Sequence, residues 1–185
     1  MPHISLPEGY PGIRSLFMYS PVTAQPMNDL VQVLLHDVST STLTPGEREL
    51  IATYTSSLNT CKYCASTHGA IARHQLGGNG QVVEEVIADP STAAISDKMK
   101  ALLVIAGKVQ QDGKKVTSDD IGAARAAGAS DKEIHDAVLI AAAFCMYNRY
   151  VDGLATWAPD DPEVYDKIGR QRAAEGYMTK PFKVS

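Results

Sequence analysis

The chain has 185 residues and a formal net charge of −4 at neutral pH; 44% of its residues are hydrophobic and 21% are charged. This length and composition fit one compact domain, and the charge provides no electrostatic attraction for nucleic acid or an anionic membrane. The longest apolar run, residues 137–147, is far too short to cross a bilayer. We therefore expect neither nucleic acid nor a membrane as a partner.

The number of cysteines and the start of the chain indicate the compartment. Three cysteines in a chain of this length do not make a disulfide framework. The first residues contain no basic stretch followed by an apolar run, so no secretory signal is visible. These features predict a reducing cytoplasmic location, where a close cysteine pair is more often catalytic or metal-binding than a structural staple.

The chain begins with a stretch rich in helix-breaking residues. Residues 1–26 contain five prolines and two glycines, and we expect them to form an irregular arm over the core. A single all-helical domain is predicted for residues 27–185. Its first helix is expected from Asn28, because apolar positions recur at helical spacing from there to Val38.

Capping patterns mark the helices that follow. Thr44, with Glu47 three residues later, forms a capping box that predicts a helix to about Leu58. Asn59 or Thr60 is expected to cap the next helix, which carries two cysteines. Further helices are predicted at residues 81–88, 96–111, 118–127, 130 to about 157, and 162 to about 177. No segment alternates apolar and polar residues between turns, so the predicted fold is all-α.

The helix that begins at Ser130 is the longest, and it is apolar nearly all round from residue 137 to 147. Such a helix is buried on several sides, which predicts a homo-oligomer. Cys145 lies inside this run and is expected to be a buried, inert core residue. Asn148 and Arg149 follow the run directly and would line the active site, line an oligomer seam, or simply mark where the helix reaches the surface.

The stretch NTCKYCASTH places Cys61, Cys64 and His68 one helical turn apart on a shared face. Free amides at a helix start stabilise a thiolate, two sulfurs at this spacing can close a disulfide, and a neighbouring imidazole can take a thiol proton. The pattern therefore predicts a dithiol that cycles between its reduced and oxidised forms. Cys61 is nearer the helix start and Cys64 is nearer His68, so these two arguments disagree on the attacking sulfur.

Other uses of the cysteine pair fit the sequence less well. A zinc site would need a second pair of ligands at zinc-finger distance, and His74 lies on a different helix face from His68. A chance pair of buried cysteines is a further alternative. A thioredoxin-like site would need a preceding strand, and a nucleotide site would need a glycine-rich loop between a strand and a helix. We expect no metal and no cofactor.

The run TPGERELIATYTSSLNTCKYCASTHGAIA resembles the signature of the AhpD-like alkylhydroperoxidases, in the peroxidase-related branch of the carboxymuconolactone decarboxylase superfamily. That signature has a glutamate, a C-x-x-C pair beginning twelve residues later, and a histidine four residues after the second cysteine. Glu49, Cys61, Cys64 and His68 match it without a gap. The helical layout resembles the family across most of the chain. Between the cysteines, the family's best-studied pattern has a histidine where this chain has Tyr63.

The resemblance implies an AhpD-like fold with the C-x-x-C at the start of a helix, and an alkylhydroperoxidase-like, peroxiredoxin-type oxidoreductase. By analogy with the family, Cys64 is the attacking thiolate, Cys61 the resolving thiol, and His68 and Glu49 the proton relay. Hydroperoxide would be the substrate, and an external dithiol or thiol protein the reductant. The pattern alone places Glu49 opposite the apolar face of its helix, as a solvated carboxylate or as one covered by a closely packed second helix.

Two other functions stay open. A disulfide-exchange or redox-sensing helical module would have the same cysteine pair but little peroxide turnover. A lactone decarboxylase of the superfamily would work by acid–base chemistry and would have no need of paired cysteines.

Overall fold

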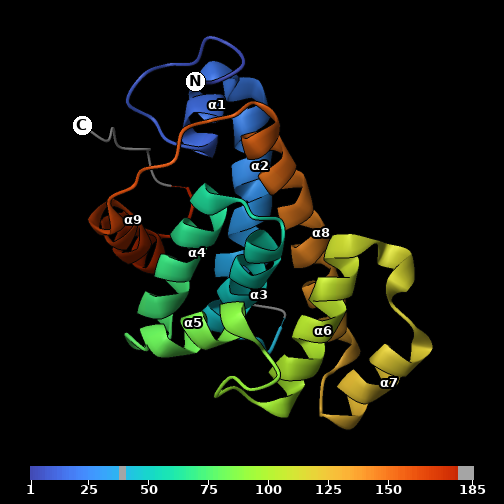
Figure 1. Cartoon of the computed structure of the whole chain (residues 1–185). Coiled ribbons are helices and arrows are strands. Elements are labelled where there is room, and N and C mark those ends of the chain that lie inside the picture. The colour runs from blue at the N-terminus through green and yellow to red at the C-terminus, as the bar shows by residue number, and fades with distance from the viewer. Residues whose placement is uncertain (38–40, 179–185) are drawn as a thin grey trace.

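The structure, a computed structural model, describes residues 1–37 and 41–178. Helices account for all the regular secondary structure of these residues, as Figure 1 shows, which confirms the predicted all-α fold. Within this part of the chain, no helix is both long and apolar enough to span a bilayer. Val38, the last apolar position predicted for the first helix, lies outside the described residues.

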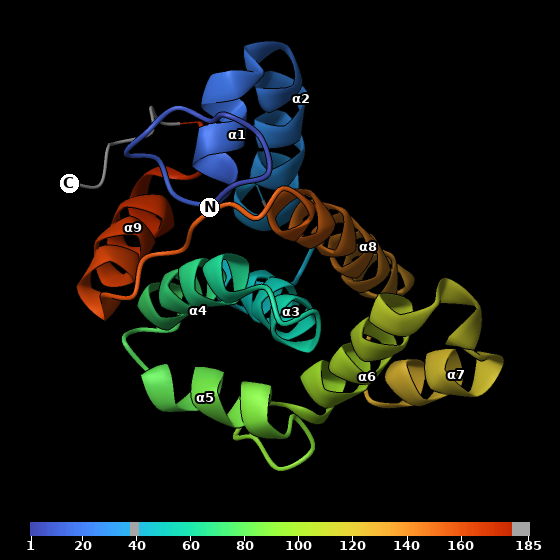
Figure 2. The same cartoon turned by 45° about the horizontal axis from the view of Figure 1, so that its top comes forward.

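A pair of helices at the centre of the molecule organises the fold. Helices α3 (Pro45–Leu58) and α4 (Lys62–Gln75) pack along each other, joined by a short turn. Figure 2 shows the other helices arranged around this pair. Around it lie α5 (Gly80–Ala88) against both, α6 (Asp97–Gln111) and α8 (Asp131–Gly153) against α3, and α9 (Pro162–Glu175) against α4. Helix α7 (Ser118–Ala126) packs on α6.

The prediction of an irregular arm over residues 1–26 is wrong for its second half. The chain forms helix α1 (Ile13–Tyr19), helix α2 (Pro21–Val31) and then a π-helical turn over Gln32–His36. Pro21 is the first residue of α2, where its missing N–H has no helical partner to lose. Pro26 lies inside α2, where its fixed φ is helical and the cost is one lost backbone hydrogen bond.

The predicted capping boxes at Thr44 and Ser130 are both present. In the first, the Thr44 hydroxyl accepts a hydrogen bond from the backbone of Glu47, and the Glu47 carboxylate accepts one from the backbone N–H of Thr44 at 2.8 Å. Because each box satisfies amide groups that a helix start leaves unpaired, it fixes where α3 and α8 begin.

The helix with the cysteines begins later than predicted, because Cys61 itself is the N-cap, instead of Asn59 or Thr60. Thr60 has a φ of 57°, which turns the chain sharply between α3 and α4. The backbone N–H of Cys61 then donates to the carbonyl of Ser56 at 3.1 Å. The turn therefore places Cys61 at the junction of the two central helices and Cys64 in the first turn of α4.

The cysteines lie in a small core cluster of their own, apart from the main core. The cluster consists of Cys61, Tyr63, Cys64, Ala70, Val151 and Tyr165. Its members come from α4, α8 and α9 and the turn before α4, so these three helices close over the cysteine pair.

One face of helix α9 is buried against α4. The contact is close because Gly169 has no side chain: an added Cβ would lie 2.7 Å from the backbone carbon of Ala70. After α9 the chain turns at Gly176, whose φ is 70°, and Tyr177 returns toward the core. The backbone N–H of Tyr177 donates to Gln32 Oε1 at 2.7 Å.

Replacing Gly169 with alanine should force α9 away from α4. We expect Gly169→Ala to lower the free energy of unfolding by about 1–3 kcal/mol through overpacking. The matched control is Gly122→Ala in α7, where an added Cβ meets nothing within 4 Å. That change should raise stability by up to about 1 kcal/mol through helix propensity. Urea denaturation measures both, and equal gains in stability for the two variants would contradict the described packing.

Candidate active site

Glu49 and His68 form a buried pair across the two central helices. Glu49 on α3 is completely buried, and its Oε2 lies 2.8 Å from Nδ1 of His68 on α4. Of the two environments that the sequence left open for Glu49, the closely packed helix is the one observed, and a solvated carboxylate is wrong. A buried carboxylate is stable only when hydrogen-bond donors surround it. The hydrogen bond from His68 therefore stabilises Glu49 in the core and also orients the imidazole.

A third residue, Tyr177, completes this pair. Its hydroxyl donates a short hydrogen bond to Glu49 Oε1 and lies 3.3 Å from His68 Nδ1. Burial and then the charge of Glu49 raise the pKa of Tyr177 well above its ordinary value, so the hydroxyl keeps its proton and remains a donor. Nothing in the local sequence pattern points to Tyr177, because it lies 128 residues from Glu49.

Aromatic rings fix the orientation of the His68 imidazole. The Phe144 ring meets it edge-on, with 4.6 Å between the ring centroids and an angle of 87° between the planes. The Tyr177 ring lies nearly parallel to it at 6.0 Å. Because Nδ1 of His68 is engaged by Glu49, Nε2 is the ring nitrogen left to exchange protons with a group in front of it.

Cys61 and Cys64 are both free thiols and differ in their surroundings. Cys61 is completely buried, whereas Cys64 is slightly exposed and lines a cavity together with His68. A hydrogen bond to Cys64 and then burial raise the pKa of the Cys61 thiol. Cys61 therefore holds its proton firmly, and of the two sulfurs only Cys64 borders the cavity.

Asp152, near the end of α8, is a further carboxylate close to the two cysteines. Partial burial raises the pKa of Asp152, and a hydrogen bond with Cys61 partly offsets this. Cys61 thus has the carboxyl group of Asp152 as well as the sulfur of Cys64 as a neighbour. The sequence pattern did not mark Asp152, which lies far along the chain from the cysteines.

The cavity in front of Cys64 has a volume of about 50 Å³, which is room for a few water molecules. Helices α1, α2, α4, α8 and α9 and the returning C-terminal stretch all contribute to its wall. The lining residues are Ile13, Arg14, Phe17, Asn28, Val31, Tyr63, Cys64, Thr67, His68, Phe144, Tyr147, Arg172 and Tyr177. The sulfur of Cys64 is therefore open only to a small or slender molecule.

Tyr63, which replaces the histidine of the family pattern, forms part of the cavity wall. It is buried and packs against Tyr165 with 6.3 Å between the ring centroids. On another side it touches the backbone of Gly12, where an added Cβ would lie 2.1 Å from the Tyr63 ring. Tyr63 therefore joins α4 to α9 and to the residues that precede α1.

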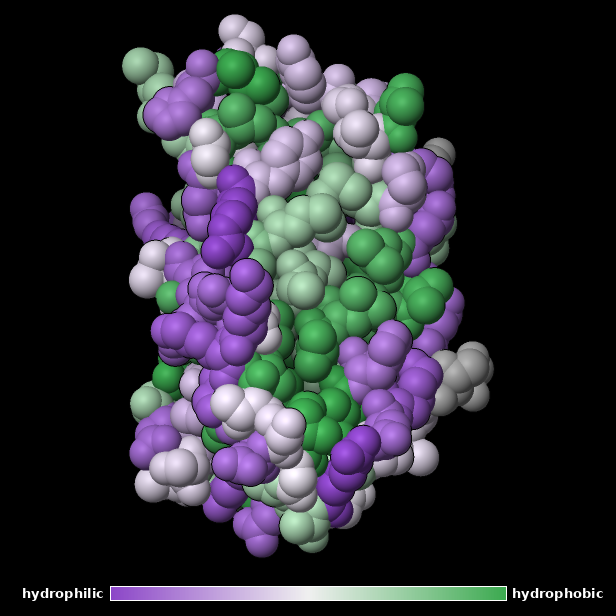
Figure 3. Space-filling model, turned by 90° about the vertical axis from the view of Figure 1, so that its right-hand side faces the viewer, coloured by the Kyte–Doolittle hydropathy of each residue, from purple (hydrophilic) through white to green (hydrophobic). Residues whose placement is uncertain are grey.

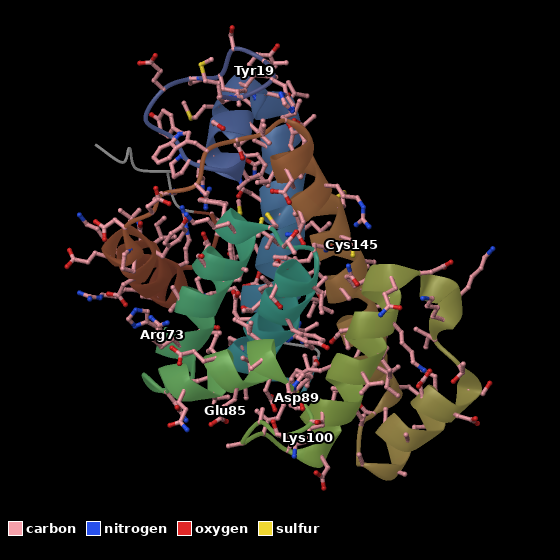
Figure 4. All side chains as sticks on the ribbon, viewed as in Figure 1. Tyr19, Arg73, Glu85, Asp89, Lys100 and Cys145 are labelled. Atoms are coloured by element: carbon pink, nitrogen blue, oxygen red, sulfur yellow. The ribbon has the colours of Figure 1, made fainter. Side chains whose placement is uncertain are left out.

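The other residues singled out in the sequence lie outside the cavity wall. Cys145 sits where α8 meets α6 (Figure 4) and accepts a hydrogen bond from Asn59 at 3.6 Å. It is half-buried, so the expectation of a fully buried core cysteine is wrong. Asn148 is completely buried and donates to Ser56 Oγ at 3.1 Å, which makes it a structural polar residue, and Arg149 is exposed.

Among the side chains of residues 1–37 and 41–178, no three His, Cys, Asp or Glu residues are grouped in a way that could hold a metal ion.

Part of the chain matches a known protein family. Residues 24–108 match the model of the carboxymuconolactone decarboxylase family. This segment contains Glu49, both paired cysteines and His68. No curated protein matches the sequence.

Solved structures resemble the chain over most of its length. One, an uncharacterized peroxidase-related protein from Ralstonia eutropha JMP134 with an alkylhydroperoxidase AhpD core, is 28% identical, with a TM-score of 0.75, over 86% of this chain and 81% of that one. A second uncharacterized peroxidase-related protein, from Silicibacter sp. TM1040, is 26% identical with a TM-score of 0.72, over 82% of this chain and 76% of that one. A protein of unknown function from Agrobacterium tumefaciens, 22% identical over 81% of this chain and 99% of that one, shares the fold with a TM-score of 0.67.

The chain resembles the AhpD-like, peroxidase-related branch of the carboxymuconolactone decarboxylase superfamily, in the segment that the family model matches and in its fold. The AhpD-like signature residues all lie within the segment that the family model matches. Tyr177 and Asp152 lie beyond its end at residue 108, so part of the candidate site comes from segments that the family model does not match.

We expect the bond between Tyr177 and Glu49 to be a charge-assisted one. Tyr177→Phe should lower the free energy of unfolding by about 1.5–3 kcal/mol, because it removes a donor from a buried carboxylate. In a Glu49→Gln background the same change should cost less, with a coupling of at least about 0.5 kcal/mol in a double-mutant cycle.

The control for this cycle is Tyr165→Phe, which removes a buried hydroxyl bonded to the carbonyl of Pro159 at 2.8 Å. It should cost about 1 kcal/mol and add independently to Glu49→Gln. If Tyr177→Phe lowers the free energy of unfolding no more than Tyr165→Phe does, and also adds independently to Glu49→Gln, then Tyr177 does not stabilise the carboxylate. Denaturant unfolding measures all five variants.

Proposed function

We propose that the protein is a thiol-dependent peroxidase that reduces hydroperoxides through Cys61 and Cys64. The observation that carries this proposal is the position of Cys64. It borders a small cavity beside His68, which is itself held by the buried carboxylate of Glu49. A sulfur, a base and the partner that orients the base are the three parts of an activated nucleophile.

In the first step, His68 takes the proton of Cys64, and the thiolate attacks the outer oxygen of the hydroperoxide. The O–O bond breaks, Cys64 becomes a sulfenic acid, and the departing oxygen takes the proton from His68 to leave as an alcohol or water. Glu49 stabilises the imidazolium while it holds the proton. Tyr177 keeps Glu49 in place by donating to its other oxygen.

In the second step, the Cys61 sulfur attacks the sulfur of the Cys64 sulfenic acid. An S–S bond forms, and the hydroxyl group leaves as water after taking up the Cys61 proton. The raised pKa of Cys61 makes a nearby base useful here, and the neighbouring carboxylate of Asp152 would take this proton and pass it on. Two electrons from an external dithiol or thiol protein then return the disulfide to two thiols.

The burial of both sulfurs favours a small oxidant over a protein disulfide. Cys61 is completely buried and Cys64 is only 5% exposed, so a protein disulfide could not reach either sulfur without movement of the surrounding helices. A thiol protein that reduces the pair would need the same movement, whereas a small dithiol would need less. A peroxide group needs no such movement. The need to return the pair to its reduced form fits a reducing compartment such as the cytoplasm.

Single-cysteine variants test these roles. Cys64→Ser should abolish peroxide consumption with a dithiol as reductant, because a hydroxyl group is a poor nucleophile and forms no sulfenic acid. Cys61→Ser should permit one turnover and leave a sulfenic acid on Cys64 that a dimedone reagent traps. Cys145→Ala is the control and should keep the wild-type rate. A trapped sulfenic acid on Cys61 in the Cys64→Ser variant, with its first turnover intact, would reverse the assignment.

We propose further that the protein is a homo-oligomer. Helices α6, α7 and α8 form one side of the molecule in Figure 1, and Figure 3 shows apolar side chains gathered along the middle of that side. Val104 on α6 and Leu139 and Met146 on α8 are between 39% and 50% exposed. A second copy that presents the same surface would cover these side chains.

Sedimentation velocity tests this assembly. The wild-type protein should sediment as an oligomer, and Met146→Glu should shift it toward the monomer because a carboxylate would be buried in the contact. The control is Met18→Glu, which changes a methionine of similar exposure on α1. A wild-type monomer at micromolar concentration rules out the proposed assembly.

A further inference from the structure

The cavity in front of Cys64 has a positive lining. Two arginines line it, Arg14 from α1 and Arg172 from α9. The imidazole of His68 is also part of the wall. Among the described residues, no aspartate or glutamate lines the cavity. A small, mostly apolar space with two guanidinium groups has the features of a site for an anion.

The two arginines are held close enough to affect each other. Arg172 is 2% exposed, and its NH1 donates to the carbonyl of Gly176 at 3.1 Å. Burial and then the charge of Arg14 lower the pKa of Arg172 to about 10, so it stays charged at neutral pH. An anion between the two groups would relieve this repulsion.

Arg14 has no anionic partner within the described part of the chain. It is half-buried and stacks over the ring of Phe17, with 6.0 Å from the guanidinium carbon to the ring centroid. Its guanidinium group makes no hydrogen bond or ion pair with any residue that the structure describes, and the backbone N–H of Arg14 donates to the carbonyl of Pro11 at 3.1 Å. A guanidinium group in that state can take a carboxylate without first breaking another bond.

Arg14 also stands where the cavity meets the surface. An outer hollow of about 230 Å³ lies between α1, α2 and the returning C-terminal stretch, and it shares Arg14, Phe17, Asn28 and Tyr177 with the cavity. The side-chain oxygen of Asn28 is buried there without a hydrogen-bond partner among the described residues. A molecule that enters through the hollow therefore passes Arg14 and Asn28 before it reaches Cys64.

We propose that the substrate is an organic hydroperoxide that carries a carboxylate, which Arg14 and Arg172 bind while the peroxide group lies at Cys64. The identity of the reacting group rests on the proposed peroxidase function, and the chemistry at sulfur is the same as described above. The recognition of an anion is a property of the cavity itself and can be measured without peroxide. Both arginines lie outside residues 24–108, the segment that matches the family.

The first test compares two alkylating reagents of nearly the same shape, anionic iodoacetate and neutral iodoacetamide, on the reduced Cys61→Ser protein. Peptide mass mapping gives the ratio of the two rates at Cys64 and, as an internal reference, at Cys145. We expect the iodoacetate-to-iodoacetamide ratio at Cys64 to exceed that at Cys145 by about tenfold. Arg14→Gln should bring the two ratios close together. Equal ratios at both cysteines in the unsubstituted background would overturn the inference.

Two further variants separate recognition from folding. Arg172→Gln should lower the ratio at Cys64 as Arg14→Gln does, and Arg14→Gln decides the matter if the loss of buried Arg172 prevents folding. Arg170→Gln is the matched control, because Arg170 lies on the same helix but is exposed and pairs with Asp166. It should leave the ratio unchanged. A drop as large as that of Arg14→Gln would reveal a general effect of charge, which also contradicts a specific site.

The second test uses peroxides. It compares kcat/KM for the unbranched acid 5-hydroperoxypentanoate with that for its methyl ester, which has the same peroxide group and no charge. We expect the acid to be preferred by about tenfold, and Arg14→Gln to remove the preference by slowing the acid alone. Equal rates for acid and ester overturn the substrate assignment and leave the peroxidase standing. Reduction of neither, together with a clear iodoacetate preference, overturns the peroxidase and leaves an anion site.

Discussion

A completely buried carboxylate, Glu49, is the constraint on which the rest of the site depends. An ionised carboxylate without donors costs several kcal/mol in a protein interior. Two donors answer this requirement, the imidazole of His68 and the hydroxyl of Tyr177. The first requires α3 and α4 to pack closely, and the second requires the chain to return after α9. The packing of α3 on α4 and the return of the chain after α9 thus both depend on this carboxylate.

This arrangement also explains how α9 and the stretch after it shape the surroundings of Cys64 and His68 on α4. Gly169 lets α9 approach the backbone of α4, and α9 in turn carries Arg172 into the cavity wall. At Tyr63, Gly12 lets the chain before α1 lie directly on the ring. The cavity is thus closed by segments from both ends of the described chain around a sulfur from its middle. Its small size and positive lining are consequences of that closure.

The local signals in the sequence identified most helices, and long-range packing accounts for what they missed. Capping boxes at Thr44 and Ser130 are complete within four residues, so the starts of α3 and α8 could be read directly. The prolines before residue 27 indicated irregular structure, but Pro21 at a helix start and Pro26 with a helical φ are both compatible with α2. The spacing of Glu49, the cysteines and His68 marked the core of the site. Tyr177 could not be predicted, because its role depends on a turn at Gly176 and on the packing of α9.

The central claim is that the buried network makes Cys64 the reactive thiol, and the most direct measurement is a competition within one molecule. The fully reduced protein is given less than one equivalent of hydrogen peroxide, and peptide mapping compares oxidation of Cys64 with that of Cys145, which lies outside the cavity. Nearly all the oxidant should end in a Cys61–Cys64 disulfide. His68→Ala should reduce that preference near neutral pH, because a positioned base contributes about 10²–10⁴-fold, and His74→Ala, on the same helix, should not. Oxidation of Cys145 as readily as Cys64 would contradict the account.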